Sequence, residues 1–541
     1  MLSKVDLFIQ SKNYSGGLKL AKKLLKNNAV KREAFSKAIF CATQLGDQKE
    51  ALTLYKKAHA NFSNDDAILQ NFAGFCFSIK RIKDALTLYL KLLKRHPEDG
   101  ITLANIAACH LFGDDVEQAE EFALKAIETG RTSSNAYDIL GTIYLKKGRV
   151  ADAESQMITA LEQFQPSLHS AYNYLQFCEN HNQYENCERV FASLPDNLKG
   201  HPSILLQMGI VLSRVKQYEP AYHMFEQALA GVHVLDTRKQ KKLAFEYGKL
   251  LDKMGRSEEA FTAFQKGNAI AKDLCNLPER PNQNDLINLQ ARIIVAGDDV
   301  EEAPVFVIGF PRTGTTLVDQ ILSTDCNVQS FEESAVLENL FDSQANLIEA
   351  SAVLDRSELQ RRFFREYRES MAWDGKSILV DRSAPNFVRC RFIRSLFPNA
   401  KIIILHRHPC DVVLSCFMQD FAENQLTREF FDLKSTAELY DHAMSVVKMD
   451  EQMLSVRYED LIEDFDNVSQ KIFNFLGLTW TEDTRDFYKT ALNKEAIRTA
   501  SYHQVTKPLY KDALNRWERY RGEMEPVLPL LSPWIKALGY T

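Results

Sequence analysis

The sequence predicts two successive folds: an all-α superhelix of stacked helical pairs, followed by an α/β domain with a central parallel sheet. Small residues recur with a period of 34 positions through the first half of the chain. Continuous apolar segments typical of buried parallel strands follow at residues 305–308 and 401–405. The 541 residues include only 22 glycines and 16 prolines, about 7% together against an average of about 12%, which indicates a largely helical chain with short connections.

The repeat frame is defined by small residues in segments such as KEALTLYKKA and KDALTLYLKL. The frame position is held by Gly17, Ala51, Ala85, Ala119, Ala153, Cys187 and Ala221. Small residues let two helix backbones approach closely, and large apolar residues at i, i+3 and i+4 fill the remaining space. Each repeat is therefore expected to be a pair of antiparallel helices that buries its apolar face by stacking on its neighbours.

This period and its fragments resemble the tetratricopeptide repeat (TPR) over residues 1–275, so a TPR superhelix is expected there. TPR arrays usually present a concave surface to a protein or peptide. The alternative is a scaffold that only dimerises the chain or positions its second half. Pro278 and Pro281 interrupt the helical pattern, so we predict a linker at 276–302 and a second domain at 303–541.

A predicted phosphate-binding loop, GFPRTGTT at 309–316, lies between the strand at 305–308 and a helix at 317–322. Free backbone N–H groups and the helix dipole at such a junction attract anions. The loop lacks the lysine of G-x-x-x-x-G-K-[ST], which disfavours nucleoside triphosphate hydrolysis, and Arg312 supplies the cation instead. The candidate donor-binding residues of this loop are Pro311, Arg312, Thr313, Gly314, Thr315 and Thr316.

A second predicted anion site follows the strand at 401–405. Arg407 and Ser415 lie eight positions apart, one at the end of the strand and one in the next helix, and together they could clamp a phosphate. Tyr458, in the segment VRYEDL, could stack on a base. A ligand with two phosphate groups requires two such sites, and the chain provides both.

These motifs resemble those of sulfotransferases, whose donor is 3′-phosphoadenosine 5′-phosphosulfate (PAPS). The segment PRTGTT resembles the 5′-phosphosulfate loop, which implies a P-loop-like domain, and Arg407 with Ser415 resembles the 3′-phosphate motif. Ser501 and Arg516 resemble the serine and lysine of protein-tyrosine sulfotransferases, which implies that Ser501 holds a sulfate oxygen and that Arg516 lies near the nucleotide. The resemblance covers about 304–541 and is closest to repeat-bearing bacterial sulfotransferases related to protein-tyrosine sulfotransferases.

The same resemblance assigns the catalytic groups. Glu333, in the segment FEES, matches the catalytic glutamate, and Glu332 is the alternative base. Arg382, in VDRSAPNF, stands near the position of a family lysine that assists the leaving group. Arginine stabilises negative charge but does not readily donate a proton, so electrostatic stabilisation is the role expected of Arg382.

The predicted function is PAPS-dependent transfer of a sulfonyl group to a hydroxyl acceptor, a tyrosine-like protein or peptide recruited by the TPR array. One alternative is a carbohydrate or small-alcohol sulfotransferase whose repeats serve assembly, and another is a non-enzymatic interaction protein with a decayed nucleotide domain.

Composition limits the cofactors and partners. The net charge of −6 argues against a nucleic-acid partner, and the ten cysteines contain no C-x-x-C pair, so no metal cofactor is predicted. We find no signal peptide and no apolar segment of about 18 residues, so we expect a cytoplasmic protein without a membrane partner. A homodimer is an assembly that the repeats would allow.

Overall fold

The computed structural model describes residues 2–275, 277, 289, 292–298, 303–349, 352–447, 449–489 and 514–540. Internal contacts divide the chain into two compact units, Met1–Val211 and Leu212–Thr541, which are described separately. The division at 275 and 303 rests on the sequence pattern alone and stays a prediction.

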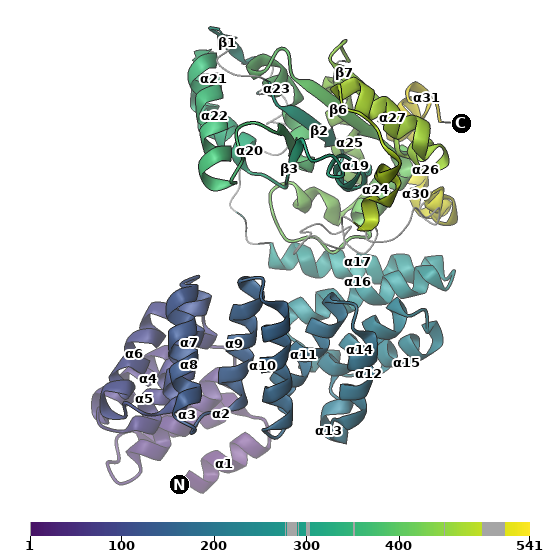
Figure 1. Cartoon of the computed structure of the whole chain (residues 1–541). Coiled ribbons are helices and arrows are strands. Elements are labelled where there is room, and N and C mark those ends of the chain that lie inside the picture. Colours follow the sequence, from purple (N-terminus) through teal and green to yellow (C-terminus); the bar gives the residue numbers. More distant parts are fainter. Residues whose placement is uncertain are drawn as a thin grey trace. The chain divides into compact units, whose positions relative to one another are not determined.

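The first unit is a succession of helices that run back and forth, joined by short turns (Figure 1). They are α1 (Leu2–Gln10), α2 (Tyr14–Leu24), α3 (Lys31–Gln44), α4 (Gln48–Asn61), α5 (Asp66–Ser78), α6 (Ile82–Arg95), α7 (Gly100–Phe112), α8 (Val116–Glu128), α9 (Ser134–Lys146), α10 (Val150–Glu162), α11 (Leu168–Asn180), α12 (Tyr184–Ser193), α13 (Asp196–Lys199) and α14 (Pro202–Arg214), whose last turn belongs to the second unit.

The repeat frame accounts for the packing of these helices. The alanines at the frame positions of α4, α6, α8 and α10 are fully buried, namely Ala51, Ala85, Ala119 and Ala153. A Cβ atom on Gly141 of α9 would lie only 2.9 Å from Met157 Cγ of α10, so a side chain there would displace its neighbour. The predicted all-α array of helical pairs is therefore confirmed.

The second unit begins with α15 (Tyr218–Ala230), the short helix η1 (Val232–Val234), α16 (Thr237–Lys253) and α17 (Ser257–Leu274). A five-stranded parallel sheet in the order β3-β5-β2-β6-β7 follows. Its strands are β2 (Val305–Gly309), β3 (Val328–Glu332), β5 (Ile378–Arg382), β6 (Lys401–His406) and β7 (Met453–Arg457). The predicted strands at 305–308 and 401–405 are confirmed as β2 and β6. A separate parallel pair joins β1 (Ile294–Ala296) to β4 (Val353–Asp355).

Helices and short helical turns connect the strands and complete the unit. They are α19 (Thr315–Leu322), α20 (Val336–Asp342), α21 (Ala345–Glu349), α22 (Arg356–Ser370), η3 (Ala384–Arg389), α23 (Cys390–Leu396), α24 (Pro409–Phe417), η4 (Thr427–Phe431), α25 (Leu433–Val446), α26 (Tyr458–Glu463), α27 (Phe465–Leu476), η5 (Glu482–Asp486), η6 (Arg516–Tyr520), α30 (Arg521–Met524), η7 (Glu525–Val527) and α31 (Leu528–Ala537).

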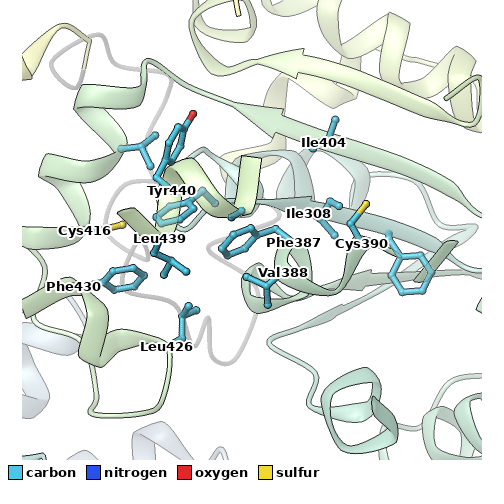
Figure 2. Packing of buried hydrophobic residues seen from close by; sticks show 14 of the residues in the cluster. Ile308, Phe387, Val388, Cys390, Ile404, Cys416, Leu426, Phe430, Leu439 and Tyr440 are labelled. Carbon is cyan, nitrogen blue, oxygen red and sulfur yellow. The ribbon is translucent and has the colours of Figure 1, made fainter. Parts of the chain in front are cut away.

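The sheet is covered by apolar side chains on both faces, which explains why its central strands are apolar without alternation. Successive residues of a strand point to opposite faces, so Phe306 and Ile308 of β2 belong to one core and Val305 and Val307 to the other. Figure 2 shows the first core, in which Ile308 and other sheet residues pack with side chains of η3 and α25. The predicted α/β domain with a central parallel sheet is confirmed. Of the helices that the structure describes, none has the length and apolar character needed to cross a membrane.

Candidate active site

The carboxyl ends of the parallel strands gather the predicted site residues at one edge of the sheet. The registers pair Glu332 with Arg382 across β3 and β5, and His406 with Arg457 across β6 and β7. The predicted phosphate loop leaves the sheet at the same edge, after Gly309 of β2. In open α/β sheets this edge is where ligands bind, close to the point at which the strand order reverses.

The phosphate loop is a tight turn between β2 and the N-terminus of α19. The Thr313 hydroxyl donates to the Phe310 carbonyl oxygen at 2.8 Å. Gly314 caps α19 with φ +103°, and Arg312 also adopts a positive φ of +77°. Thr315 and Thr316 open the helix, where backbone N–H groups have no intrahelical acceptor. This arrangement leaves backbone donors at the start of α19, which is the geometry that the predicted anion site requires.

The structure brings the two predicted anion motifs together. Arg312 Nε donates to Ser415 Oγ at 3.1 Å, which links the loop to α24. Arg407 Nη1 donates to the carbonyl oxygen of Arg312 at 3.3 Å, and the Arg407 guanidinium lies over the Tyr458 ring, 5.2 Å from its centroid. A Cβ atom on Gly314 would lie 2.7 Å from Tyr458 Cδ2. Ser415, Arg407 and Tyr458, which lie far from the loop in the sequence, therefore form one continuous group with it.

The positive charge of Arg407 is partly balanced by Asp411 of α24. Asp411 Oδ2 lies 3.7 Å from Arg407 Nη2. Burial raises the pKa of Asp411, and the arginine opposes this shift. Burial also raises the pKa of Tyr458, which keeps the hydroxyl protonated near neutral pH. The group therefore offers cations and a neutral aromatic ring to a ligand.

Both candidate bases share a single arginine. Arg382 Nη1 donates to Glu333 Oε1 at 2.9 Å, and the same guanidinium forms an ion pair with Glu332. The Glu333 side chain is 40% exposed and that of Glu332 is 18% exposed, whereas that of Arg382 is 1% exposed. Desolvation raises the pKa of Glu333, with the attraction of Arg382 acting against it. Glu333 is therefore the more accessible carboxylate, and its pKa is shifted toward neutrality.

A buried polar network surrounds Asp381, the residue before Arg382. The Tyr367 hydroxyl lies 2.7 Å from Asp381 Oδ2, and Asn386 Nδ2 donates to Asp381 Oδ1 at 3.0 Å. Burial raises the pKa of Asp381 to about 7. Sequence reasoning assigned no role to Asp381 or Tyr367, although the aspartate directly precedes Arg382 and so marks the end of the same strand.

The remaining predicted residues lie elsewhere or outside the description. Cys416 Sγ donates to the Pro311 carbonyl oxygen at 3.4 Å, which ties the loop to α24. Arg516 Nη2 donates to Asp252 Oδ2 of α16 at 2.5 Å. Ser501 lies outside the described residues. Within the described part of the chain, no three His, Cys, Asp or Glu side chains form a metal-binding group.

Two histidines flank Arg407 and are both buried. Burial lowers the pKa of His406 to about 4 and that of His408 to about 4, so both rings are neutral near pH 7. The ring of His408 stacks on Trp517 with 5.1 Å between centroids. This packing agrees with a structural role for His408.

Part of the second half of the chain is similar to a known protein family. Residues 304–482 match the sequence model of the Sulfotransferase family. An uncharacterized protein of Aquifex aeolicus is 24% identical over 443 residues, which cover 77% of this chain and 57% of that protein. The protein-tyrosine sulfotransferase of Drosophila melanogaster is 22% identical over 261 residues, covering 44% of this chain and 51% of the enzyme. The chain thus spans little more than half the length of these two relatives.

A tetratricopeptide repeat protein from Parabacteroides merdae aligns with a TM-score of 0.33 at 17% identity, covering 44% of this chain and 93% of that structure. Residues 304–482 of the α/β unit are thus similar to the Sulfotransferase family, and in the same chain they follow a helical repeat array.

Proposed function

We propose that this chain is a sulfotransferase that uses PAPS as its donor and transfers the sulfonyl group to the hydroxyl of a tyrosine-like residue in a protein or peptide. The observation that carries the proposal is the direct contact of Arg312 with Ser415 and of Arg407 with the Arg312 backbone. Two cations thereby lie beside a loop whose Gly314 has no room for a side chain. Such a cradle suits a nucleotide with separate 5′ and 3′ anionic groups.

The donor-binding roles follow from this arrangement. The amides of the loop and Arg312 suit the 5′-phosphosulfate, because backbone donors and a cation would meet the charge that builds up on the bridging oxygen. Arg407 and Ser415 suit the 3′-phosphate, and Tyr458 suits the adenine. PAPS supplies the sulfonyl group. Ser501 and Arg516 keep the roles that the family resemblance implies.

Glu333 is the proposed general base. A base works best when its pKa lies near the working pH, and desolvation shifts the pKa of Glu333 in that direction. Its 40% exposed side chain can receive the proton of an acceptor hydroxyl. Arg382 orients Glu333 and stabilises negative charge nearby, while Glu332 neutralises part of the guanidinium charge.

The helical array is proposed to hold the acceptor protein or peptide. A cavity of about 680 Å³ lies among α5, α6, α7, α9 and α11 of the array and combines aromatic with polar side chains, among them Phe77, Phe112, Asn105, Asn135 and His169. Phe112 is 56% exposed, which leaves an apolar surface for an acceptor side chain. Amide side chains next to it can bond to the backbone of an extended peptide.

The direct test is to incubate the full chain with PAPS and either a tyrosine-peptide library or a glycan panel. We expect 3′-phosphoadenosine 5′-phosphate (PAP) to form with peptides, to be lost in Arg312→Ala, and to persist in Arg361→Ala, an exposed arginine of α22. Glu333→Gln should bind PAP normally but transfer slowly. Turnover on glycans alone would overturn the acceptor class, and full turnover by Arg312→Ala would overturn the site.

A further inference from the structure

The helices α16 and α17 contact the segment that carries the proposed 3′-phosphate residues. Asn268 Nδ2 of α17 donates at 2.8 Å to the carbonyl oxygen of Phe417, the last residue of α24. Phe261 of α17 stacks on the Phe417 ring with 5.0 Å between centroids. Lys241 Nζ of α16 lies 2.6 Å from Glu423 Oε1, in the loop that follows α24. The orientation of α24 therefore depends on this helical pair.

One carboxylate of α16, Asp252, holds the short helix η6. Its Oδ2 accepts from Arg516 Nη2 at 2.5 Å, and its Oδ1 accepts from the Tyr520 hydroxyl at 2.7 Å. Arg519 Nη1 donates to the Asp252 carbonyl oxygen at 3.0 Å, and its Nη2 lies 3.2 Å from Oδ1. The side chain of Asp252 is only 7% exposed. A buried carboxylate with two cations and a hydroxyl fixes η6 more firmly than a surface ion pair would.

The short helix η6 in turn contacts the Arg407 group. The Trp517 backbone N–H donates to Asp411 Oδ1 at 2.8 Å, and Asp411 Oδ2 lies 3.7 Å from Arg407 Nη2. The Trp517 ring stacks on His408, the residue after Arg407, at an interplanar angle of 9°. Asp252 is therefore connected to Arg407 through η6, in which Arg516 contacts Asp252 and the next residue, Trp517, contacts Asp411 of α24.

We propose that Asp252 is a positioning residue of the donor site, which sets the orientation of Arg407 toward a nucleotide 3′-phosphate through Trp517 and Asp411. The inference rests on the proposed PAPS donor and adds to it: a residue outside the matched sulfotransferase segment controls recognition of the 3′-phosphate. When Asp252 loses its charge, η6 is released, Asp411 loses an N–H donor, and the carboxylate draws the Arg407 guanidinium more strongly.

The test compares two nucleotides on the full chain by calorimetry. PAP carries a 3′-phosphate, and adenosine 5′-phosphate (AMP) lacks it. We expect Asp252→Asn to weaken PAP binding about tenfold and AMP binding less than about twofold. A tenfold change is about the effect of one charge-assisted hydrogen bond. The matched control is Glu259→Gln, which breaks an exposed ion pair with Arg256 on α17 and should change neither affinity. Asp252→Glu keeps the charge and should restore most of the preference for PAP.

The outcomes separate the inference from the function on which it rests. If the wild-type chain binds PAP and Asp252→Asn retains the same PAP-to-AMP affinity ratio, Asp252 is only structural and the inference fails alone. If Asp252→Asn and Asp252→Glu each weaken the binding of PAP and of AMP by the same factor, the conclusion is the same. If the wild-type chain does not bind PAP, the proposed donor is wrong and the inference falls with it.

Discussion

Replacing Gly314 by alanine is the sharpest test of the proposed donor cradle. The residue caps α19 with φ +103°, a backbone conformation that L residues rarely adopt. An added Cβ would lie 2.7 Å from Tyr458 Cδ2 and 3.3 Å from its Cε2. Ordinary carbon contacts are about 3.5–4.0 Å, so the tyrosine ring must move by about 1 Å or the loop must open. That ring lies under the Arg407 guanidinium, so the displacement reaches the second cation.

The size of the effect can be estimated from these two terms. Holding a non-glycine residue in a sparsely populated conformation costs about 1–3 kcal/mol. Overpacking by one methyl group adds about 1–3 kcal/mol where the neighbour cannot relax. If about 2 kcal/mol of the total acts on nucleotide binding, PAP affinity falls about 30-fold.

Gly477→Ala is the matched control for backbone strain. Gly477 follows α27 with φ +79°, and an added Cβ would meet nothing within 4 Å. We expect it to destabilise the chain by about 1 kcal/mol without altering PAP binding. Calorimetric titration of PAP into both variants, with thermal unfolding as a check on folding, measures the difference. Equal PAP affinities in Gly314→Ala and Gly477→Ala would refute the assignment of the loop.

Three further outcomes follow from the site. Arg382→Lys replaces the guanidinium that contacts both glutamates with a point charge, so we expect sulfonyl transfer to slow about 100-fold. The acidic limb of the pH–rate profile should also move to higher pH, because the pKa of Glu333 rises. An unchanged profile would contradict the role of Arg382. Ser415→Ala removes the hydroxyl proposed to bind the 3′-phosphate and should weaken PAP binding about fivefold in calorimetry while sparing AMP, and equal weakening of both would count against a 3′-phosphate role. Asp381→Asn should gain stability relative to the wild type as the pH rises from 5 to 7, by at most about 1.4 kcal/mol per pH unit. The reason is that the native aspartate, with its pKa of about 7, still binds a proton that the unfolded chain has released. Urea unfolding at both pH values measures the difference in free energy of unfolding, and a constant difference would contradict the prediction.

The parts of the fold that follow local rules could be predicted from the sequence. The array can be predicted because small residues must recur wherever two helices cross, as at Ala51 and Ala85. The strands β2 and β6 can be predicted because a strand buried on both faces is continuously apolar. The loop at 309–316 can be predicted because close approach of the backbone to a phosphate requires glycine at particular positions, and Gly314 occupies one of them.

The contacts that complete the site depend on pairings that one sequence does not contain. Arg382 meets Glu332 because β3 and β5 are neighbours in the sheet, although they lie 50 residues apart along the chain. Arg516 contacts Asp252 across 264 residues, where the resemblance alone placed it near the nucleotide. Strand order and the docking of η6 determine these partners, and both depend on tertiary packing rather than local propensity.

Two of the proposed catalytic residues share a backbone feature that links the halves of the site. Arg312 and Glu333 both adopt positive φ, +77° and +51°, which is unfavourable for residues with a side chain. Each is held by an arginine at the end of a neighbouring strand. Arg407, which follows β6, donates to the carbonyl oxygen of Arg312 at 3.3 Å. The carbonyl oxygen of Arg382, the last residue of β5, accepts the N–H of Glu333 at 2.9 Å.

These arginines therefore have two functions at once, since each supplies positive charge and also contacts a strained segment that carries a reactive side chain. Replacing the Arg407 side chain removes the bond to the backbone of the loop together with the charge, whereas replacing the Arg382 side chain leaves its backbone bond to Glu333 in place, because the carbonyl oxygen remains. The loss of PAP affinity in Arg407→Ala should accordingly exceed the loss expected for one phosphate contact. The defect of Arg382→Ala should be confined to transfer.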